Sequence, residues 1–196
     1  TARLSSGSWT LDVALTGPGG TNADVTGTIG ADGRMNLSAR GAAPLGLANG
    51  LLEPRRIAGQ ASFDLQLDGA PALTSLSGTI RTAGASLATG VQGISLTDIA
   101  GTVTLSGGQA RVALSSALSA GGRIAVEGSV GLAAPFAADL TVTADSLALR
   151  DPELYQTTAS GRITLSGPLS GGAQIAGTIT LGPTEIQIPS SGFPYW

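Results

Sequence analysis

Apolar and polar residues alternate along most of the chain. Between Ile57 and Leu67, every second residue is apolar or glycine, and most of the residues between them are polar or charged. A period of two is typical of strands with one apolar face, and it returns over 124–132 and 175–181. Further strands are predicted over 9–16, 34–40, 76–81, 99–106, 110–116, 136–144 and 161–166. The pattern therefore predicts an all-β fold.

Short turn signals separate these segments. Asp32-Gly33 lies between two alternating stretches and predicts a two-residue hairpin turn. Glycine pairs at 107–108, 121–122 and 171–172 indicate further turns, less specifically. Short turns join antiparallel strands, so we expect a mainly antiparallel meander.

Two segments interrupt the alternation. Residues 44–52 are apolar without a period of two and predict a short helix or an apolar loop. Asp151 precedes Pro152, which predicts a helical turn with Asp151 as its N-cap. Neither segment is long enough to form a separate domain.

Seven five-residue segments, called phrases below, share one pattern. Each has a glycine at its centre and an apolar residue at both ends. Its glycine is in phase with the apolar face. Inside a strand, glycine costs roughly 0.5–1 kcal/mol relative to alanine and marks a bend or a close approach. We therefore expect a sheet curled toward its apolar face, with the glycines relieving crowding inside the bend. They are Gly27, Gly59, Gly78, Gly101, Gly128, Gly161 and Gly177.

Composition narrows the architecture and the function. The chain has 30 glycines among 196 residues and only 4% aromatic residues, so it lacks the bulky side chains that usually fill a sandwich or barrel. The charged fraction is 12% and the formal net charge is −3, which argues against nucleic acid as a partner. No apolar run approaches the length of a membrane-spanning helix, and the first residue is not Met. We expect residues 1–196 to be one elongated β segment of a larger protein.

The residues needed for common catalytic sites are missing. The chain has no histidine and no cysteine, which excludes Ser-His-Asp, Cys-His and HExxH arrangements. The nearest pair of carboxylates, Asp151 and Glu153, is better explained as the start of the helical turn. We expect no enzyme, no cofactor and no metal site.

A curled sheet with one apolar face can close as a barrel, pack against a second sheet or stay open as a groove. An open groove would expose much apolar surface unless an apolar ligand occupied it, and an acyl chain fits that description. The candidate groove-lining residues are large apolar residues of the alternating segments, with a lining role only. They are Ile57, Phe63, Leu65, Leu67, Ile99, Val103, Leu105, Ile163, Leu165, Ile175, Ile179 and Leu181.

Several phrases occur in an order that resembles the TamB family, and in particular its alphaproteobacterial members. Asp151-Pro152-Glu153-Leu154-Tyr155 is followed by a Gly-Pro-Leu segment at 167–169, by the glycine phrase at 175–179 and by Glu185-Ile186-Gln187-Ile188-Pro189. Residues 43–59 also resemble a family segment. The likeness covers roughly residues 40–190.

The resemblance implies a long β-sheet folded lengthwise into a hydrophobic groove, in a protein that spans the periplasm. It implies an anchor in the inner membrane, supplied by an N-terminal segment outside this chain. It also implies a TamA-type outer-membrane barrel as partner, contacted through a C-terminal part outside this chain. The implied roles are phospholipid transport between the inner and outer membranes and support of outer-membrane protein and autotransporter assembly and secretion.

Other interpretations remain open from the sequence. One is a closed β-sandwich with glycine kinks. A second is a structural or adhesive β-solenoid, although the spacing between the phrase glycines varies from 16 to 33 residues. A third keeps the family resemblance and makes the protein a holder of unfolded outer-membrane protein strands, bound by edge pairing.

Overall fold

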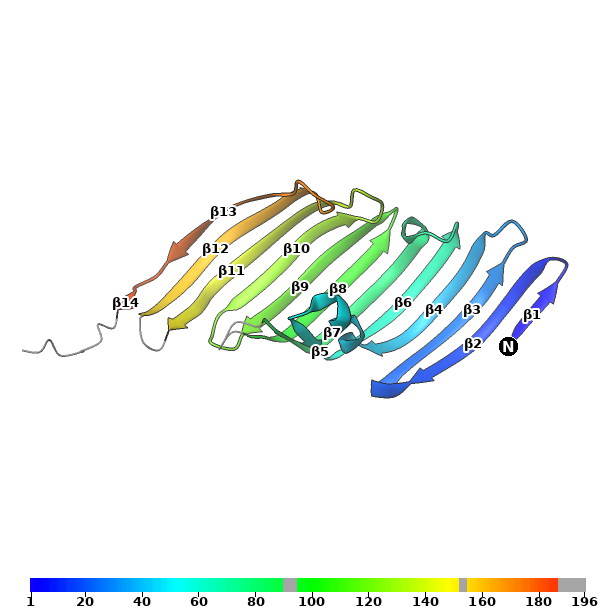
Figure 1. Ribbon diagram of the computed structural model, residues 1–196, viewed down its shortest axis with the longest axis horizontal. Helices are drawn as coiled ribbons and strands as arrows, with labels where there is room; N and C mark the ends of the chain where they lie inside the picture. The colour runs from blue at the N-terminus through cyan, green and yellow to red at the C-terminus, as the bar shows by residue number, and fades with distance from the viewer. Residues whose placement is uncertain (90–94, 152–154, 187–196) are drawn as a thin grey trace, which may run out of the picture.

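The computed structural model describes residues 1–89, 95–151 and 155–186, which form one 14-stranded sheet (Figure 1). Each strand coincides with a segment of alternating or β-branched residues. The strands are β1 (Ala2–Ser5), β2 (Ser8–Gly17), β3 (Thr21–Ile29), β4 (Met35–Pro44), β5 (Arg56–Ala58), β6 (Gln60–Gly69), β7 (Leu76–Ala88), β8 (Ser95–Ser106), β9 (Gln109–Leu118), β10 (Arg123–Gly131), β11 (Ala137–Asp151), β12 (Tyr155–Pro168), β13 (Gln174–Leu181) and β14 (Glu185–Ile186).

The sheet is an antiparallel meander that stays open. Its spatial order follows the chain from β1 to β13, except that β5 pairs with β7 and β14 pairs with β12. The edge strands β1 and β13 lie at opposite ends of the sheet (Figure 1). The expected all-β antiparallel sheet is confirmed. The closed sandwich and the solenoid are wrong, because the described strands make a single unclosed sheet.

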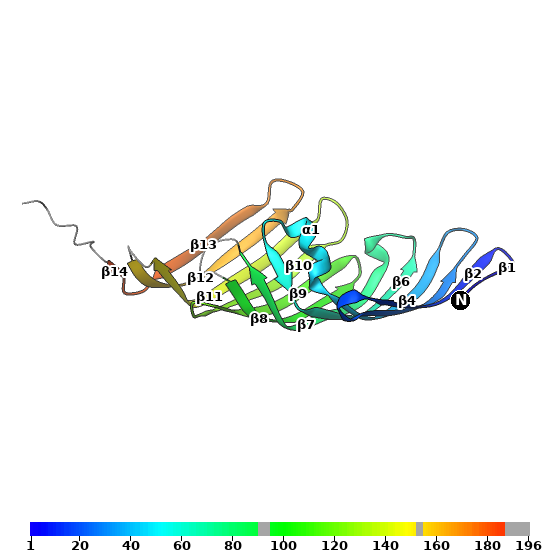
Figure 2. The same cartoon turned by 60° about the horizontal axis from the view of Figure 1, so that its bottom comes forward.

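The described residues form one layer rather than two. The solvent-accessible surface is 12,814 Å². A compact protein of this mass would expose only about 8,400 Å². Among the described residues, no large side chain is fully buried. Figure 2 shows that the layer is curled rather than flat. The excess surface follows from this shape, because neither face is covered by a second sheet.

Of the two alternatives expected over 44–52, a short helix or an apolar loop, the structure shows the short helix. A 3₁₀ turn (η2, Leu45–Ala48) runs into a single α-helical turn (α1, Asn49–Leu52) between β4 and β5. The Asn49 side-chain oxygen accepts a hydrogen bond from the Ile57 N–H at 2.7 Å and so fixes this insertion against β5. The other expected helical turn falls on residues 152–154, outside the described residues, and Asp151 is the last residue of β11.

The strand predicted from Ile57 to Leu67 is two strands. It breaks at Gly59. Strand β5 pairs with residues 86–88 of β7, whereas β6 pairs with β4 and with residues 76–82 of β7. Gly59 has φ +121°, and an added Cβ would lie 2.8 Å from the Cα of Ala85, which is fully buried. The close approach of Gly59 to Ala85 therefore requires glycine and bends the chain between the two strands.

The turn signals give hairpins of different lengths. Gly107 and Gly108 alone join β8 to β9, with φ of 57° and 74°, as expected for a two-residue turn. Asp32-Gly33 also marks a hairpin, but the loop between β3 and β4 spans residues 30–34. There the Gly30 N–H donates to the Arg34 carbonyl at 2.8 Å. The expected two-residue loop at Asp32-Gly33 is therefore wrong in length.

Candidate functional site: the apolar face of the open sheet

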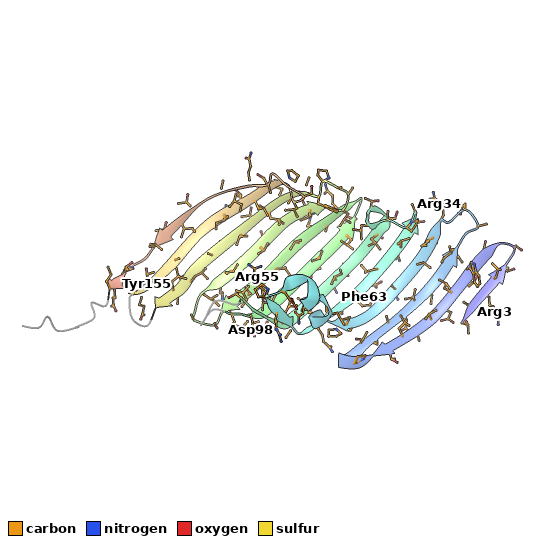
Figure 3. All side chains as sticks on the ribbon, viewed as in Figure 1. Arg3, Arg34, Arg55, Phe63, Asp98 and Tyr155 are labelled. Carbon is orange, nitrogen blue, oxygen red and sulfur yellow. The ribbon has the colours of Figure 1, made fainter. Side chains whose placement is uncertain are left out.

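The register of the strands brings one apolar residue or one glycine from each of ten strands into a continuous row. Directly opposite residues of antiparallel strands project from the same face. The row, called the Phe63 row below, crosses ten strands, and Phe63 is labelled in Figure 3. It consists of Ala23, Gly41, Phe63, Ile80, Val103, Val112, Gly128, Leu140, Leu165 and Ile175.

Ten of the twelve candidate lining residues, from β6, β8, β12 and β13, lie on this face. Four of them, Phe63, Val103, Leu165 and Ile175, belong to the Phe63 row itself. The others are placed by alternation along the same strands and by their partners: Leu65 and Leu105 opposite Gly78, Leu67 opposite Leu37 and Leu76, Ile163 opposite Gly177, Ile179 opposite Gly161, and Leu181 opposite Ala159.

The two remaining candidates lie toward the far end of the strands. Ile57 of β5 stands opposite Leu87 of β7, which in turn stands opposite Leu96 of β8 and, beyond it, Leu118 of β9. Ile99 of β8 stands opposite the buried Ala85. These pairings extend the apolar face past the break at Gly59.

Most of these side chains are half-buried although no second layer covers them. Leu105 is only 7% exposed. Since the described residues form a single layer, this burial comes from lateral packing against side chains of neighbouring strands. The exception is β13, where Ile175, Ile179 and Leu181 are 75%, 58% and 59% exposed.

Besides Ile80 of β7, sequence reasoning missed the lining residues of three central strands. The strands at 110–116, 124–132 and 136–144 were expected, but their apolar residues were not chosen as candidates. The alternation within these strands was the signal that could have found them. They are Val112 and Leu114 of β9, Val126 and Val130 of β10, and Leu140 and Val142 of β11.

The phrase glycines are required by the backbone of the neighbouring strand. At Gly128, which has φ +139°, an added Cβ would collide with the carbonyl oxygen of Asp139 on β11. The expectation that glycine relieves crowding between side chains is therefore wrong in its cause. In all seven phrases an added Cβ would instead meet backbone atoms of the adjacent strand.

Beside each glycine, the neighbouring strand has one residue that an added Cβ would face. This residue is usually a large aliphatic one. The residues on the side that an added Cβ would face are Leu37 for Gly27, Ala85 for Gly59, Leu65 for Gly78, Leu114 for Gly101, Leu140 for Gly128, Ile179 for Gly161 and Ile163 for Gly177. An eighth site of the same kind, Gly41 between Ala39 and Ala43, was overlooked because its flanking apolar residues are alanines.

The opposite face is polar and holds a broad, open hollow. This depression of about 580 Å³ lies over β9 to β12 and is lined by Arg111, Glu127, Asp139 and Arg162 together with Ser and Thr hydroxyls. Its charged lining is unsuited to acyl chains. Elsewhere on this face Arg40 and Asp64 form an exposed ion pair at 3.1 Å.

Within residues 1–89, 95–151 and 155–186, no group of three or more His, Cys, Asp or Glu residues could hold a metal ion. In the same part of the chain, no helix has both the length and the apolar character needed to cross a membrane.

The fold and its face define an open, single-layer β-sheet protein with one continuous apolar surface. Residues 109–194 match the family model described as the TamB C-terminal domain. The match begins at β9 and includes β10 to β14, so it supports the similarity to the TamB family for this part of the sheet. No curated protein and no solved structure matched the chain.

Proposed function

We propose that this chain is a TamB-like segment of the translocation and assembly module and that its apolar face accommodates phospholipid acyl chains. The continuous Phe63 row is the observation on which this proposal depends most. Burial of each methylene of an acyl chain contributes about 0.8 kcal/mol, so a face of Leu, Ile and Val side chains is a favourable surface for such chains. The phospholipid headgroups would stay in water at the rim of the sheet.

The apolar face is better suited to movement of acyl chains along it than to tight binding of one acyl chain. Most strands from β6 to β12 present an aliphatic side chain in the row, with Phe63 on β6 and Gly128 on β10 as the exceptions. An acyl chain would therefore find sites of nearly equal free energy along the sheet. This uniformity suits phospholipid transport between the inner and outer membranes.

In this proposal the parent protein works in the periplasm of a Gram-negative, alphaproteobacterial cell and is anchored in the inner membrane. A TamA-type barrel in the outer membrane is its partner, and the pair supports outer-membrane protein and autotransporter assembly and secretion. Because the matched model describes a C-terminal domain, the proposal puts this segment toward the TamA end of the parent. The chain binds and guides rather than catalyses.

Native mass spectrometry of the purified chain tests the lipid proposal. We expect co-purified phospholipid with the unchanged chain. Leu114→Asp, on the apolar face of β9, should abolish the lipid peaks because it puts a carboxylate among aliphatic side chains. Ser115→Asp, the next residue on the polar face, should retain them and serves as the matched control, with circular dichroism confirming that both variants fold.

The outcome separates a lipid-binding face from a holder of unfolded strands. A holder would bind extended chains through the backbone at the sheet edge, and Leu114→Asp would leave that binding unchanged. Equal lipid binding by the folded Leu114→Asp and Ser115→Asp variants would refute the lipid proposal. A lipid-free preparation of the unchanged chain that also fails to take up added phospholipid would refute it as well.

A further inference from the structure

The strands end at two margins of the sheet, and the two margins differ in chemistry. At one end of β6 to β13, four loops join successive strands (Figure 1). None of their residues is charged, whereas the loop between β3 and β4 at the same end contains Asp32 and Arg34. The four loops, together called the uncharged margin below, are residues 70–75, 107–108, 132–136 and 169–173.

The uncharged margin is continuous and exposes large apolar side chains. The Leu132 N–H donates a hydrogen bond to the Gly108 carbonyl oxygen at 2.9 Å. The Leu169 N–H donates to the Phe136 carbonyl oxygen at 3.1 Å, so that neighbouring loops are joined. The exposed fractions of Leu73, Phe136 and Leu169 are 54%, 37% and 46%. This margin therefore offers apolar surface and no charged group to a ligand.

The opposite ends of the strands have arginines. Arg55 directly precedes β5 and is labelled in Figure 3, Arg56 is the first residue of β5, and Arg123 is the first residue of β10. All three are exposed, and within the described part of the chain none of them forms an ion pair. Asp145 stands opposite Arg123, but its carboxylate accepts a hydrogen bond from the Ser146 hydroxyl at 2.8 Å instead. These three guanidinium groups, called the arginine margin below, are available to an anionic group.

The length of the strands determines how far a lipid reaches between the margins. From Arg123 to Gly131, β10 covers eight steps of about 3.3 Å, or about 27 Å. One leaflet supplies about half of the ~30 Å hydrocarbon core of a bilayer, so acyl chains span about 15 Å. Acyl chains that start beside Arg123 would end near Gly128, in the Phe63 row. A lipid that lies along the strands therefore has its headgroup at one margin and its methyl ends near the middle of the face.

We propose that phospholipids lie on the apolar face with their headgroups at the arginine margin and their acyl chains directed toward the uncharged margin. Guanidinium groups donate charge-assisted hydrogen bonds to phosphate oxygens, often two at once, and the uncharged margin has no such donor. This inference rests on the proposed function, because it specifies the orientation of the lipid that the face binds.

Carboxylates at the same end of the strands suit the second ionic group of a zwitterionic headgroup. Glu53 precedes Arg55, and Asp98, labelled in Figure 3, follows Thr97 of β8, which lies in register with Arg123 across β9. Both carboxylates are exposed. A phosphate can therefore pair with an arginine while the ammonium group of the same headgroup lies near a carboxylate.

Both margins consist of loops and strand ends rather than of edge strands. A further strand that pairs with β1 or β13 in the parent protein would lengthen the margins without covering them. In such a longer sheet, the headgroups of successive lipids would follow one side of the apolar face while the lipids move from strand to strand.

Fluorescence quenching measures the orientation, since the chain has no cysteine and takes a dye at a single introduced one. Ala120→Cys and Ala133→Cys put the dye at exposed alanines in the loops at either end of β10, near the arginine margin and at the uncharged margin. Phosphatidylcholine with a nitroxide on its headgroup should quench the dye at position 120 at least about threefold more than at 133, since exposed ion pairs each contribute modestly. With the nitroxide at the methyl end of an acyl chain, quenching should instead be strongest at Val112→Cys.

Neutral variants test whether the arginines hold the headgroup. Replacement of Arg55, Arg56 and Arg123 by glutamine should bring the headgroup quenching ratio between positions 120 and 133 close to one. The matched control loses the same number of charges from exposed positions on the polar face and should keep the ratio. It carries Arg81→Gln, Arg111→Gln and Arg162→Gln. Circular dichroism confirms that both variants fold.

The results distinguish failure of the orientation from failure of the proposed function. No quenching at positions 112, 120 and 133 with either lipid would refute the proposed function, and this inference with it. Quenching at Val112→Cys by the methyl-end label, together with equal headgroup quenching at 120 and 133 or a stronger effect at 133, would overturn only the orientation. A headgroup ratio that survives the loss of the three arginines would also overturn it.

Discussion

Strand β13 and the interior strands have the same sequence pattern and differ in what surrounds them. Leu105 of β8 has strands on both sides and is 7% exposed, whereas Ile179 of β13 has a strand on one side and is 58% exposed. Both side chains are aliphatic and both lie on the apolar face. In a one-layer sheet, therefore, the number of flanking strands determines burial, because no second layer exists to provide it.

The phrase glycines show the same contrast. Gly128 lies between Val112 and Leu140 on two flanking strands, whereas among the described strands Gly177 has only Ile163 beside it. Both would bring an added Cβ against a neighbouring carbonyl oxygen, that of Asp139 for Gly128 and that of Arg162 for Gly177. The interior strand is held from both sides, but the edge strand has room to move away.

The largest effect is expected from substitutions that test whether β13, unlike an interior strand, can move away from its neighbour. Gly128→Leu should lower the free energy of unfolding by at least about 3 kcal/mol, because its Cβ collides with a backbone that cannot shift. Gly177→Leu should cost clearly less, since β13 is free to separate locally from β12. Urea unfolding measures both changes.

The control for these variants is a glycine in open space. Gly50, in α1, has no atom within 4 Å of an added Cβ and has an ordinary φ, so Gly50→Ala should change the free energy of unfolding by less than about 0.5 kcal/mol. Equal losses for Gly128→Leu and Gly177→Leu would contradict the difference between interior and edge.

Truncation of a leucine should give the next largest effect. Leu105→Ala removes a buried side chain and should cost about 2–3 kcal/mol of unfolding free energy. Leu181→Ala, at 59% exposure on β13, should cost less than about 1 kcal/mol because less of its surface is removed from water. The same urea titration measures both, and similar costs would show that lateral packing does not set burial.

Hydrogen exchange should show a smaller difference between the interior strands β9 and β10 and the edge strand β13. Amides of β9 and β10 have partners on both sides and should open only in larger unfolding events. Those of β13 that face away from β12 should exchange at least about tenfold faster. Mass spectrometry of peptides from the two regions measures the ratio, and protection of β13 equal to that of β9 in a monomeric sample would contradict the contrast.

The smallest effect is expected on the polar face. Arg40 and Asp64 are 68% and 52% exposed, so their ion pair is strongly screened by solvent. Asp64→Asn should change the free energy of unfolding by less than about 0.5 kcal/mol, and added salt should hardly alter that difference. A loss as large as that of Leu105→Ala would mean that the polar face, rather than lateral apolar packing, stabilises the sheet.

Alternation and turn residues were sufficient to predict the all-β antiparallel fold and the face on which ten of the twelve candidates lie. They could not give the break at Gly59, because it depends on the approach of Ala85, a residue 26 positions away in the sequence. The far parts of β7, β11 and β12 were missed for a similar reason. Their residues pair across bulges near Ala85 and Ala144, where a strict period of two is lost.

The exposure of β13 was also beyond sequence reasoning. Ile175 and Leu165 look alike in the alternating pattern and belong to the same row, but only the strand order shows that Ile175 lies at an edge. The hollow on the polar face was missed because Arg111, Glu127, Asp139 and Arg162 come from four strands whose register only the structure shows.

Photo-cross-linking along β9 tests most directly whether the apolar face is the lipid-binding surface. A photoreactive residue is placed in turn at Arg111, Val112, Ala113 and Leu114, and the chain is exposed to labelled phospholipid. The account predicts that lipid is captured at Val112 and Leu114 and not at the alternate positions, because side chains along a strand project to opposite faces. Capture that is equal at all four positions, or confined to Arg111 and Ala113, would contradict it.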